Sequence, residues 1–181
     1  MSDSPTICIP EELFACAESS CFAGTYDLAT LEAGPDEYRF EKPLTWSVTI
    51  TNTGDALLVD GVVSGVAKTD CARCLDEYQA EYTGEVQGYF LLSEENAAPE
   101  DMDDDEFDVL PASKEIDMKP LLEAGILLEL PLIPLCKEDC KGLCSTCGEN
   151  LNQRKCSCDS EDTDFEQAKN PFSALKDYSF E

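Results

Sequence analysis

The sequence predicts an α+β protein that is mainly an antiparallel β sheet or open barrel, with one covering helix and a C-terminal cysteine-rich zinc module. Three observations lead to this prediction. Apolar residues recur at every second position across much of residues 38–92, a helical stretch follows near residues 117–130, and six of the eleven cysteines lie within residues 136–158. A chain of 181 residues can bury one ordinary core and also carry a small module that depends on a metal.

Composition divides the chain into six segments. They are an acidic N-terminal segment (1–21), an antiparallel β domain with a CxxC knuckle (22–92), an acidic linker (93–113), a helix with an extended proline segment (114–135), the cysteine-rich zinc module (136–158) and an acidic C-terminal tail (159–181). Three cysteines in the first segment, Cys8, Cys16 and Cys21, have no close partner in sequence. Solitary cysteines more often behave as small hydrophobes or inert thiols than as ligands, so we expect them to take no part in metal binding.

The balance of charge limits the partners. The chain has 39 aspartates and glutamates against 12 lysines and arginines, and its formal net charge is −27. Because nucleic-acid binding relies largely on basic side chains that release counterions from phosphates, we expect little direct binding of RNA or DNA. The charge favours a basic partner, of which a ribosomal protein or a positively charged assembly factor would be an example.

The N-terminus gives no sign of a targeting segment. It has no basic region followed by an apolar core, and no run in the chain approaches the roughly 18 apolar residues that span a bilayer. We therefore expect no membrane association and a cytoplasmic location. Thiols stay reduced there, so clustered cysteines indicate a metal rather than disulfides.

Three stretches between residues 38 and 92 predict strands. In residues 44–51, Leu44, Trp46, Val48 and Ile50 alternate with serine and threonine, which is typical of a half-buried strand. Residues 56–69 are rich in valine and glycine and alternate less regularly, and residues 77–92 alternate again. We expect the two longer strands to be joined through the pair Cys71 and Cys74, with the 44–51 strand beside them in a twisted sheet.

The acidic run at 93–108 is most simply a solvated linker, and an acidic decoy for a basic partner is the sharper alternative. Beyond it, Asp117 can cap a helix in which Pro120 lies within the first turn, and the helix is expected to stop at Pro131. Its apolar residues would cover the sheet, and their excess could also hold a partner. The residues expected to cover the sheet are Leu121, Leu122, Ile126 and Leu130.

Eight cysteines fall into four short-spaced pairs, which suit two zinc sites of four sulfurs each because a tight turn can aim two thiolates at one ion. The pairs are Cys71/Cys74, Cys136/Cys140, Cys144/Cys147 and Cys156/Cys158. Since the chain has no histidine, every strong soft ligand must be a cysteine. The four pairs can be combined into two sites in three ways.

The entropy of closing a loop favours one of these combinations. The last two pairs lie within 15 residues, so a local site costs the least, and the first pair would then join Cys136 and Cys140 across a long loop. Gly148 suits the turn after Cys147, because a glycine lets backbone N–H groups turn toward the sulfurs. Cys156 and Cys158 converge on one ion only if the segment between them is bent. A single ligand from this pair and a cross-braced arrangement remain open alternatives.

Rival chemistries fit the sequence less well. The spacing of Cys140, Cys144 and Cys147 matches that of radical iron–sulfur enzymes, but that chemistry needs a large barrel. Cys71 and Cys74 resemble a thioredoxin-like redox pair, although such a pair expects a strand-to-helix setting. Nucleophilic hydrolysis with a Ser-His-Asp or Cys-His arrangement is excluded because there is no histidine. We therefore predict that the protein is not an enzyme.

The order of four motifs closely resembles a known family. CARCL follows a valine-rich strand, then come EIDMKPLLEAGILLELPLIPLC, CKGLCSTCGENLN and CSC, over about residues 38–158. Together they resemble the bacterial YceD-type family, which is named for large-subunit ribosomal RNA accumulation and also occurs in plant organelles. One departure is Asn170-Pro171-Phe172, where the family has a basic Asp-Pro-Arg signature, so a tail contact to RNA is not expected here.

This resemblance implies a non-enzymatic role in large ribosomal subunit biogenesis. The family's gene commonly neighbours that of a small large-subunit ribosomal protein, which suggests a ribosomal-protein partner. The acidic charge agrees with such a role, because an acidic factor can promote rRNA accumulation indirectly by keeping a basic ribosomal protein soluble. The alternative of a different class is a zinc-stabilised protein-interaction adaptor unrelated to ribosomes.

Overall fold

The computed structural model describes residues 5–93, 95–96, 102–103 and 106–158. The acidic tail predicted at 159–181 and part of the acidic linker predicted at 93–113 therefore lie outside the described residues. Within the described part, the structure is mostly an antiparallel β sheet covered by one helix, which confirms this part of the predicted fold class.

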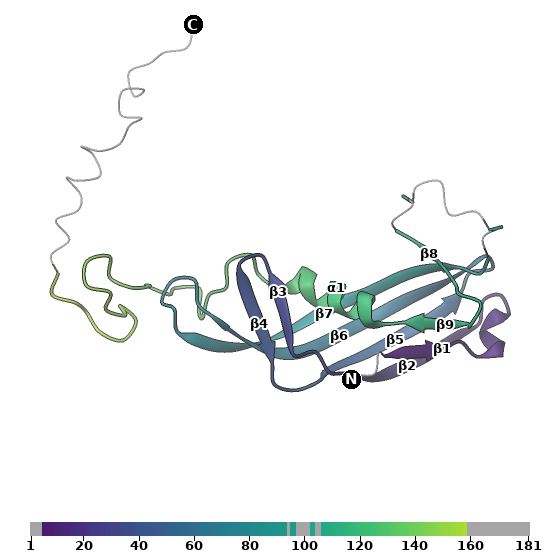
Figure 1. Ribbon diagram of the computed structural model, residues 1–181, viewed down its shortest axis with the longest axis horizontal. Helices are drawn as coiled ribbons and strands as arrows, with labels where there is room; N and C mark the ends of the chain where they lie inside the picture. The colour runs from purple at the N-terminus through teal and green to yellow at the C-terminus, as the bar shows by residue number, and fades with distance from the viewer. Residues whose placement is uncertain (1–4, 94, 97–101, 104–105, 159–181) are drawn as a thin grey trace, which may run out of the picture.

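A long hairpin of two strands forms the centre of the sheet (Figure 1). Its strands are β6 (Ala56–Asp70) and β7 (Glu77–Leu91), which pair along their whole length. β5 (Leu44–Asn52) pairs with the first part of β6, and β2 (Ser19–Tyr26) pairs with β5 at the edge. The two long strands are joined through the Cys71–Cys74 turn, as the sequence predicts.

Shorter strands complete the architecture. β4 (Asp36–Phe40) joins the far part of β6, on the same edge as β5, and β3 (Thr30–Ala33) pairs with β4. This β3–β4 hairpin stands out from the plane of the long strands (Figure 1). β8 (Asp108–Val109) pairs in parallel with the end of β7, whereas the other pairings among the described strands are antiparallel.

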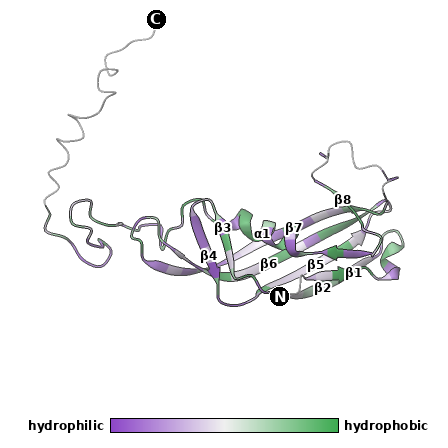
Figure 2. Cartoon of the chain, viewed as in Figure 1, coloured by the Kyte–Doolittle hydropathy of each residue, from purple (hydrophilic) through white to green (hydrophobic). Residues whose placement is uncertain are grey.

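The two-residue period of the sequence decides which face of the sheet is buried. Along β5, Leu44, Trp46, Val48 and Ile50 are buried, while the residues between them are exposed or half-buried, as predicted. Bands of hydrophobic and hydrophilic residues follow one another along β6 and β7 as well (Figure 2). The core therefore lies on one face of the sheet, under the helix.

The helix α1 (Lys119–Glu129) covers that face. Asp117 accepts a hydrogen bond from the Lys119 N–H through its carboxylate (2.9 Å), and Pro120 lies in the first turn. The helix ends before Leu130, one residue short of Pro131, because a proline disfavours helical backbone in the residue before it. Leu122, Ile126 and Leu130 are buried and Leu121 packs against them, so the predicted covering residues are confirmed. At eleven residues α1 is too short to cross a membrane, and no other described segment forms a helix that could.

Two glycines let α1 approach β7 very closely. A Cβ atom on Gly84 would lie 2.0 Å from the carbonyl oxygen of Gly125, and a Cβ atom on Gly125 would lie 2.5 Å from the carbonyl oxygen of Glu85. Both obstacles are backbone atoms that no side-chain rotation can move. The helix therefore lies almost directly on the backbone of the strand.

Residues near the N-terminus contribute to the core. β1 (Thr6–Cys8) pairs with β9 (Glu115–Asp117), and a short 3-10 helix at Glu11–Phe14 buries Leu13. The buried Asn52 amide donates a hydrogen bond to the Leu13 carbonyl (2.7 Å). Part of the predicted acidic segment 1–21 thus packs under the start of α1, and β2 begins inside it. The reason is that Ile7, Ile9 and Leu13 supply apolar surface despite the acidic residues around them.

A side-chain hydrogen bond ties α1 to the edge strand β2, and it allows a direct test of this packing. The Tyr26 hydroxyl donates to the Glu123 carboxylate at 2.6 Å, and burial together with this carboxylate raises the pKa of Tyr26. We expect Tyr26→Phe to lower the free energy of unfolding by roughly 1.5–2 kcal/mol, since a bond to a charged acceptor is lost. Urea denaturation would measure it. Tyr89→Phe on the opposite face of the sheet is the control, and an equal loss there would contradict the expectation.

Candidate metal centres

The structure brings the eight paired cysteines together in two groups of four. The first group contains Cys71, Cys74, Cys136 and Cys140, and the second contains Cys144, Cys147, Cys156 and Cys158. In each group all four sulfur atoms lie within 4.8 Å of one another. Of the three combinations open to the sequence, this is the one that loop-closure entropy favours.

The first centre joins the sheet to the C-terminal module. The turn between β6 and β7 supplies Cys71 and Cys74, and the segment after α1 supplies Cys136 and Cys140. The Cys71 and Cys140 sulfurs are 3.8 Å apart, and those of Cys74 and Cys136 are 3.7 Å apart. Cys71, Cys74 and Cys140 are buried.

These distances suit a tetrahedral metal ion. Four sulfurs held about 2.3 Å from zinc at tetrahedral angles lie about 3.8 Å from each other. The sulfur pairs of the first centre match this separation, and the Cys144 and Cys156 sulfurs of the second, 3.5 Å apart, approach it. They are too far apart for disulfide bonds, whose sulfurs lie about 2.05 Å apart. Both clusters can hold a metal ion.

Backbone N–H groups prepare the first thiol of each centre for the thiolate form. Burial opposes ionisation of Cys71. The backbone N–H groups of Cys136, Cys74 and Arg73 outweigh this effect and lower the pKa of Cys71 to about 6. At Cys144, the N–H groups of Cys147 and Thr146 lower the pKa to about 6. Because a metal binds the thiolate, hydrogen bonds that stabilise this form favour metal binding.

In each cluster, burial and the neighbouring sulfurs raise the pKa of another thiol. Burial and the other three sulfurs raise the pKa of Cys136 to about 12. A hydrogen bond with Cys147, then burial, raise the pKa of Cys158 to about 12. Four thiols this close do not all ionise by themselves, since each negative charge opposes the next. A divalent cation would remove that opposition, which is the chemistry expected of a metal centre.

The two CxxC turns share one backbone conformation. Leu75 and Gly148, the residues after the second cysteine of each turn, have φ angles of 60° and 73°. Their N–H groups donate to the carbonyls of Cys71 and Cys144, both at 2.9 Å. The positive φ angle of Gly148 agrees with the expectation that a glycine suits the position after Cys147. In the first centre a leucine occupies the same left-handed position, which L side chains rarely adopt.

Hydrogen bonds hold the C-terminal module against the first turn. Arg73 donates to the Cys140 carbonyl (3.0 Å), and the Arg73 carbonyl accepts from Leu143 (3.2 Å). Asn150 donates to the Asp76 carboxylate at 2.6 Å, and so connects the second centre to the turn between β6 and β7. The second centre lies at the end of the molecule beyond the sheet (Figure 1).

Asparagine side chains complete the surroundings of the first centre. The Asn152 amide donates to the Cys140 sulfur at 3.3 Å, and this bond lowers the pKa of Cys140 against the effect of burial. Sequence reasoning missed Asn152 and Leu75, and it did not foresee that Arg73 donates to the Cys140 carbonyl. The run Asn150-Leu151-Asn152 between two cysteine pairs was a signal for the first of these, because polar groups around metal ligands commonly orient them.

The structure also bears on the rival interpretations. Cys140 lies in the first cluster whereas Cys144 and Cys147 lie in the second, so the three sulfurs of the radical-enzyme spacing do not meet at one site. The pair Cys71 and Cys74 connects two strands, and no strand-to-helix turn is present there. Cys8, Cys16 and Cys21 are exposed, and none belongs to a cluster among the described residues.

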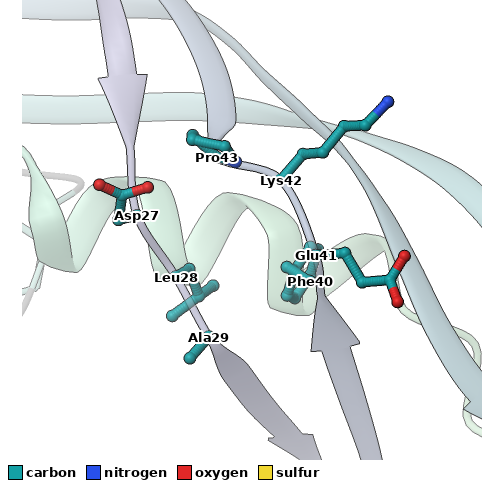
Figure 3. Close-up of a pocket in the computed structure, with 7 residues that line it drawn as sticks. All are labelled: Asp27, Leu28, Ala29, Phe40, Glu41, Lys42 and Pro43. Atoms are coloured by element: carbon teal, nitrogen blue, oxygen red, sulfur yellow. The ribbon is translucent and has the colours of Figure 1, made fainter.

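A shallow pocket of about 400 Å³ lies between the β2–β3 and β4–β5 connections. Its polar side chains are Asp27, Glu41 and Lys42, which point away from one another (Figure 3). The Lys68 amine, outside this lining, forms a hydrogen bond with Glu41 (2.7 Å). Among these lining residues no nucleophile lies beside a base.

Fold and sites together define a class: a small acidic β-sheet protein in which one helix covers the sheet and two four-cysteine clusters can hold metal ions. The comparisons with known proteins then identify the family. Residues 59–178 match the family model described as "Large ribosomal RNA subunit accumulation protein YceD". The chain belongs to this family, as the motif resemblance predicts.

Curated relatives support the assignment. A protein of Arabidopsis thaliana named "Large ribosomal RNA subunit accumulation protein YCED homolog 1, chloroplastic" is 30% identical over 157 residues, covering 71% of this chain and 47% of the relative. The homologue of the same name in Zea mays is 30% identical and covers 64% and 48%. An uncharacterized protein of Mycobacterium tuberculosis is 30% identical and covers 56% and 48%. The chain spans about half the length of these relatives. No solved structure matches it.

Proposed function

We propose that this protein is a non-enzymatic, zinc-binding factor that supports accumulation of large-subunit ribosomal RNA by binding a basic ribosomal protein or assembly factor. The single observation that carries the proposal is the family membership, because the family is named for this ribosomal RNA. The cysteine clusters support the proposed zinc binding, and the acidic charge supports the proposed basic partner.

Zinc is the proposed metal, with one ion in each cluster. Sites made of four cysteines are typical of structural zinc and of iron–sulfur clusters. Zinc is favoured because the sulfur separations near 3.8 Å fit a single tetrahedral ion. The proposed ligands are the eight clustered cysteines, in a compartment such as the cytoplasm that keeps thiols reduced.

The proposed partner follows from the charge. A chain with a formal net charge of −27 repels phosphates, and each four-thiolate zinc centre would add about −2 to that charge. An acidic companion can keep a basic protein that is destined for rRNA soluble until it is assembled. In this mechanism rRNA accumulates because its protein partner arrives, without contact between this chain and RNA.

Ribosome profiles and binding measurements test the proposal together. A strain depleted of this protein should show fewer large subunits and less 23S-type rRNA relative to the small subunit. In vitro, the zinc-loaded protein should bind a purified basic large-subunit protein with an affinity that falls as salt rises, and should bind naked rRNA poorly. Normal large subunits after depletion would instead favour an adaptor unrelated to ribosomes. Tight rRNA binding at physiological salt would contradict the proposed mechanism.

A further inference from the structure

Several large apolar side chains remain exposed where α1 runs into the cysteine-rich segment. Their exposed fractions are 84% for Leu128, 94% for Leu132 and 66% for Ile133. Leu127 is 42% exposed, so four apolar residues within seven positions face solvent. Exposed apolar groups gathered in this way mark interaction surfaces more often than singly scattered ones.

The segment that carries Leu132 and Ile133 is fixed at both ends. The Pro131 carbonyl accepts a hydrogen bond from the Tyr38 hydroxyl (3.2 Å), and the Pro134 carbonyl accepts one from the Ala72 N–H (2.8 Å). Pro134 is buried, whereas the two residues between the prolines point outward. Side chains held in place before binding lose less entropy when a partner binds them.

Leu75 adds a further exposed apolar group in the turn to which this segment is hydrogen-bonded. It belongs to the same CxxC turn as Ala72, which bonds to Pro134, and it is 66% exposed. Its φ angle of 60° is the one that Gly148 adopts at the equivalent position of the second centre. A leucine at this position is unfavourable because its backbone is left-handed and because its apolar side chain is exposed to solvent. None of its described contacts explains why a leucine is present here.

Charge selects the occupant of this surface. A second copy of the chain would also carry −27 and be repelled, and an anionic lipid surface or RNA would be repelled in the same way. The carboxylates of Glu129 and Glu138 are exposed along the same stretch of chain, and Asp139 forms an ion pair with Lys137 at 4.0 Å. A cationic protein segment with apolar side chains of its own complements both features.

We propose that Leu75, Leu128, Leu132 and Ile133, the apolar surface, form the docking site for an apolar, lysine- or arginine-bearing segment of a basic ribosomal protein. This inference rests on the proposed function and deepens it by locating the contact. The apolar side chains supply the buried centre of the interface, and the carboxylates around them attract the partner. The cysteines of the first centre lie beside this surface, with Cys74 directly before Leu75 and Cys136 two residues after Pro134.

Binding of individually purified basic large-subunit ribosomal proteins to the zinc-loaded full chain tests the proposal. We expect the double variant Leu132→Ser/Ile133→Ser to bind about tenfold more weakly, the loss typical of central interface residues. Leu75→Asn should also weaken binding without lowering the thermal midpoint, because asparagine tolerates a positive φ. The matched control is Leu58→Thr/Val62→Thr, two exposed apolar residues on the open face of the sheet, which should bind as the parent does.

Each outcome has a separate meaning. If the parent protein binds a basic large-subunit protein and the surface variants bind it equally well, the docking site is wrong while the proposed function stands. If none of those proteins binds the parent, the proposed partner and the docking site are both overturned. If sedimentation shows a dimer that the double variant converts to a monomer, the surface is an interface between copies and the inference is wrong. An unchanged zinc content together with an unchanged thermal midpoint in every variant would establish that the fold is intact.

Discussion

Replacing Cys71 by serine is expected to remove one of the two proposed zinc ions and to lower the thermal midpoint by more than about 10 °C. Cys71 is fully buried between the sheet and the C-terminal module, so its loss leaves three thiols without the ion that compensates them. Structural zinc sites bind with about 10–16 kcal/mol, which is comparable to the whole stability of a domain. Even partial loss of this energy is large for a chain of this size.

Metal analysis and calorimetry under reducing conditions measure this result. Cys8→Ser is the control, since Cys8 is exposed and lies outside both clusters, and it should keep two ions and the parent midpoint. Cys147→Ser should also lose one ion but lower the midpoint less, because Cys147 is exposed and its centre lies beyond the sheet. A Cys71→Ser protein that retains two ions and the parent midpoint would refute the first centre.

Replacing Gly84 by alanine is expected to lower the free energy of unfolding by about 3 kcal/mol, at the upper end of the usual cost of overpacking. The added Cβ would meet the carbonyl oxygen of Gly125 at 2.0 Å, so α1 must move away from β7. Gly125→Ala should cost somewhat less, because alanine favours the helix by about 1 kcal/mol relative to glycine. Urea denaturation followed by circular dichroism gives both values.

Gly88→Ala is the matched control for this prediction. Gly88 lies on the same strand and the same face, but the nearest atoms to its Cβ would be the side chains of Leu121 and Phe90, at 3.0 and 3.1 Å. Side chains can shift where a backbone cannot, so the cost should stay below about 1 kcal/mol. Equal losses at Gly84 and Gly88 would show that the close backbone approach does not limit the packing.

Local patterns predicted most of the elements but not their assembly. The alternation in residues 44–51 predicted β5 and its buried face, and Asp117 and Pro131 marked the ends of α1 within two residues. The β1–β9 pairing was not predicted, because three residues paired with a segment more than 100 positions away leave no periodic signal. The sequence also contained no signal that Gly84 and Gly125 lie against each other.

The sequence by itself determined the chemical groups of this protein: eight cysteines in close pairs, a large excess of acidic residues, and the motifs of its family. Each of these features depends only on a few consecutive residues or on the overall composition. Only the tertiary structure decided that Cys71 meets Cys140 across 69 positions, that Asn152 donates to a cluster sulfur, and that Leu132 and Ile133 face solvent between two fixed prolines. Such contacts depend on the path of the whole backbone, because the order of residues fixes which side chains share a face but not which distant faces come together.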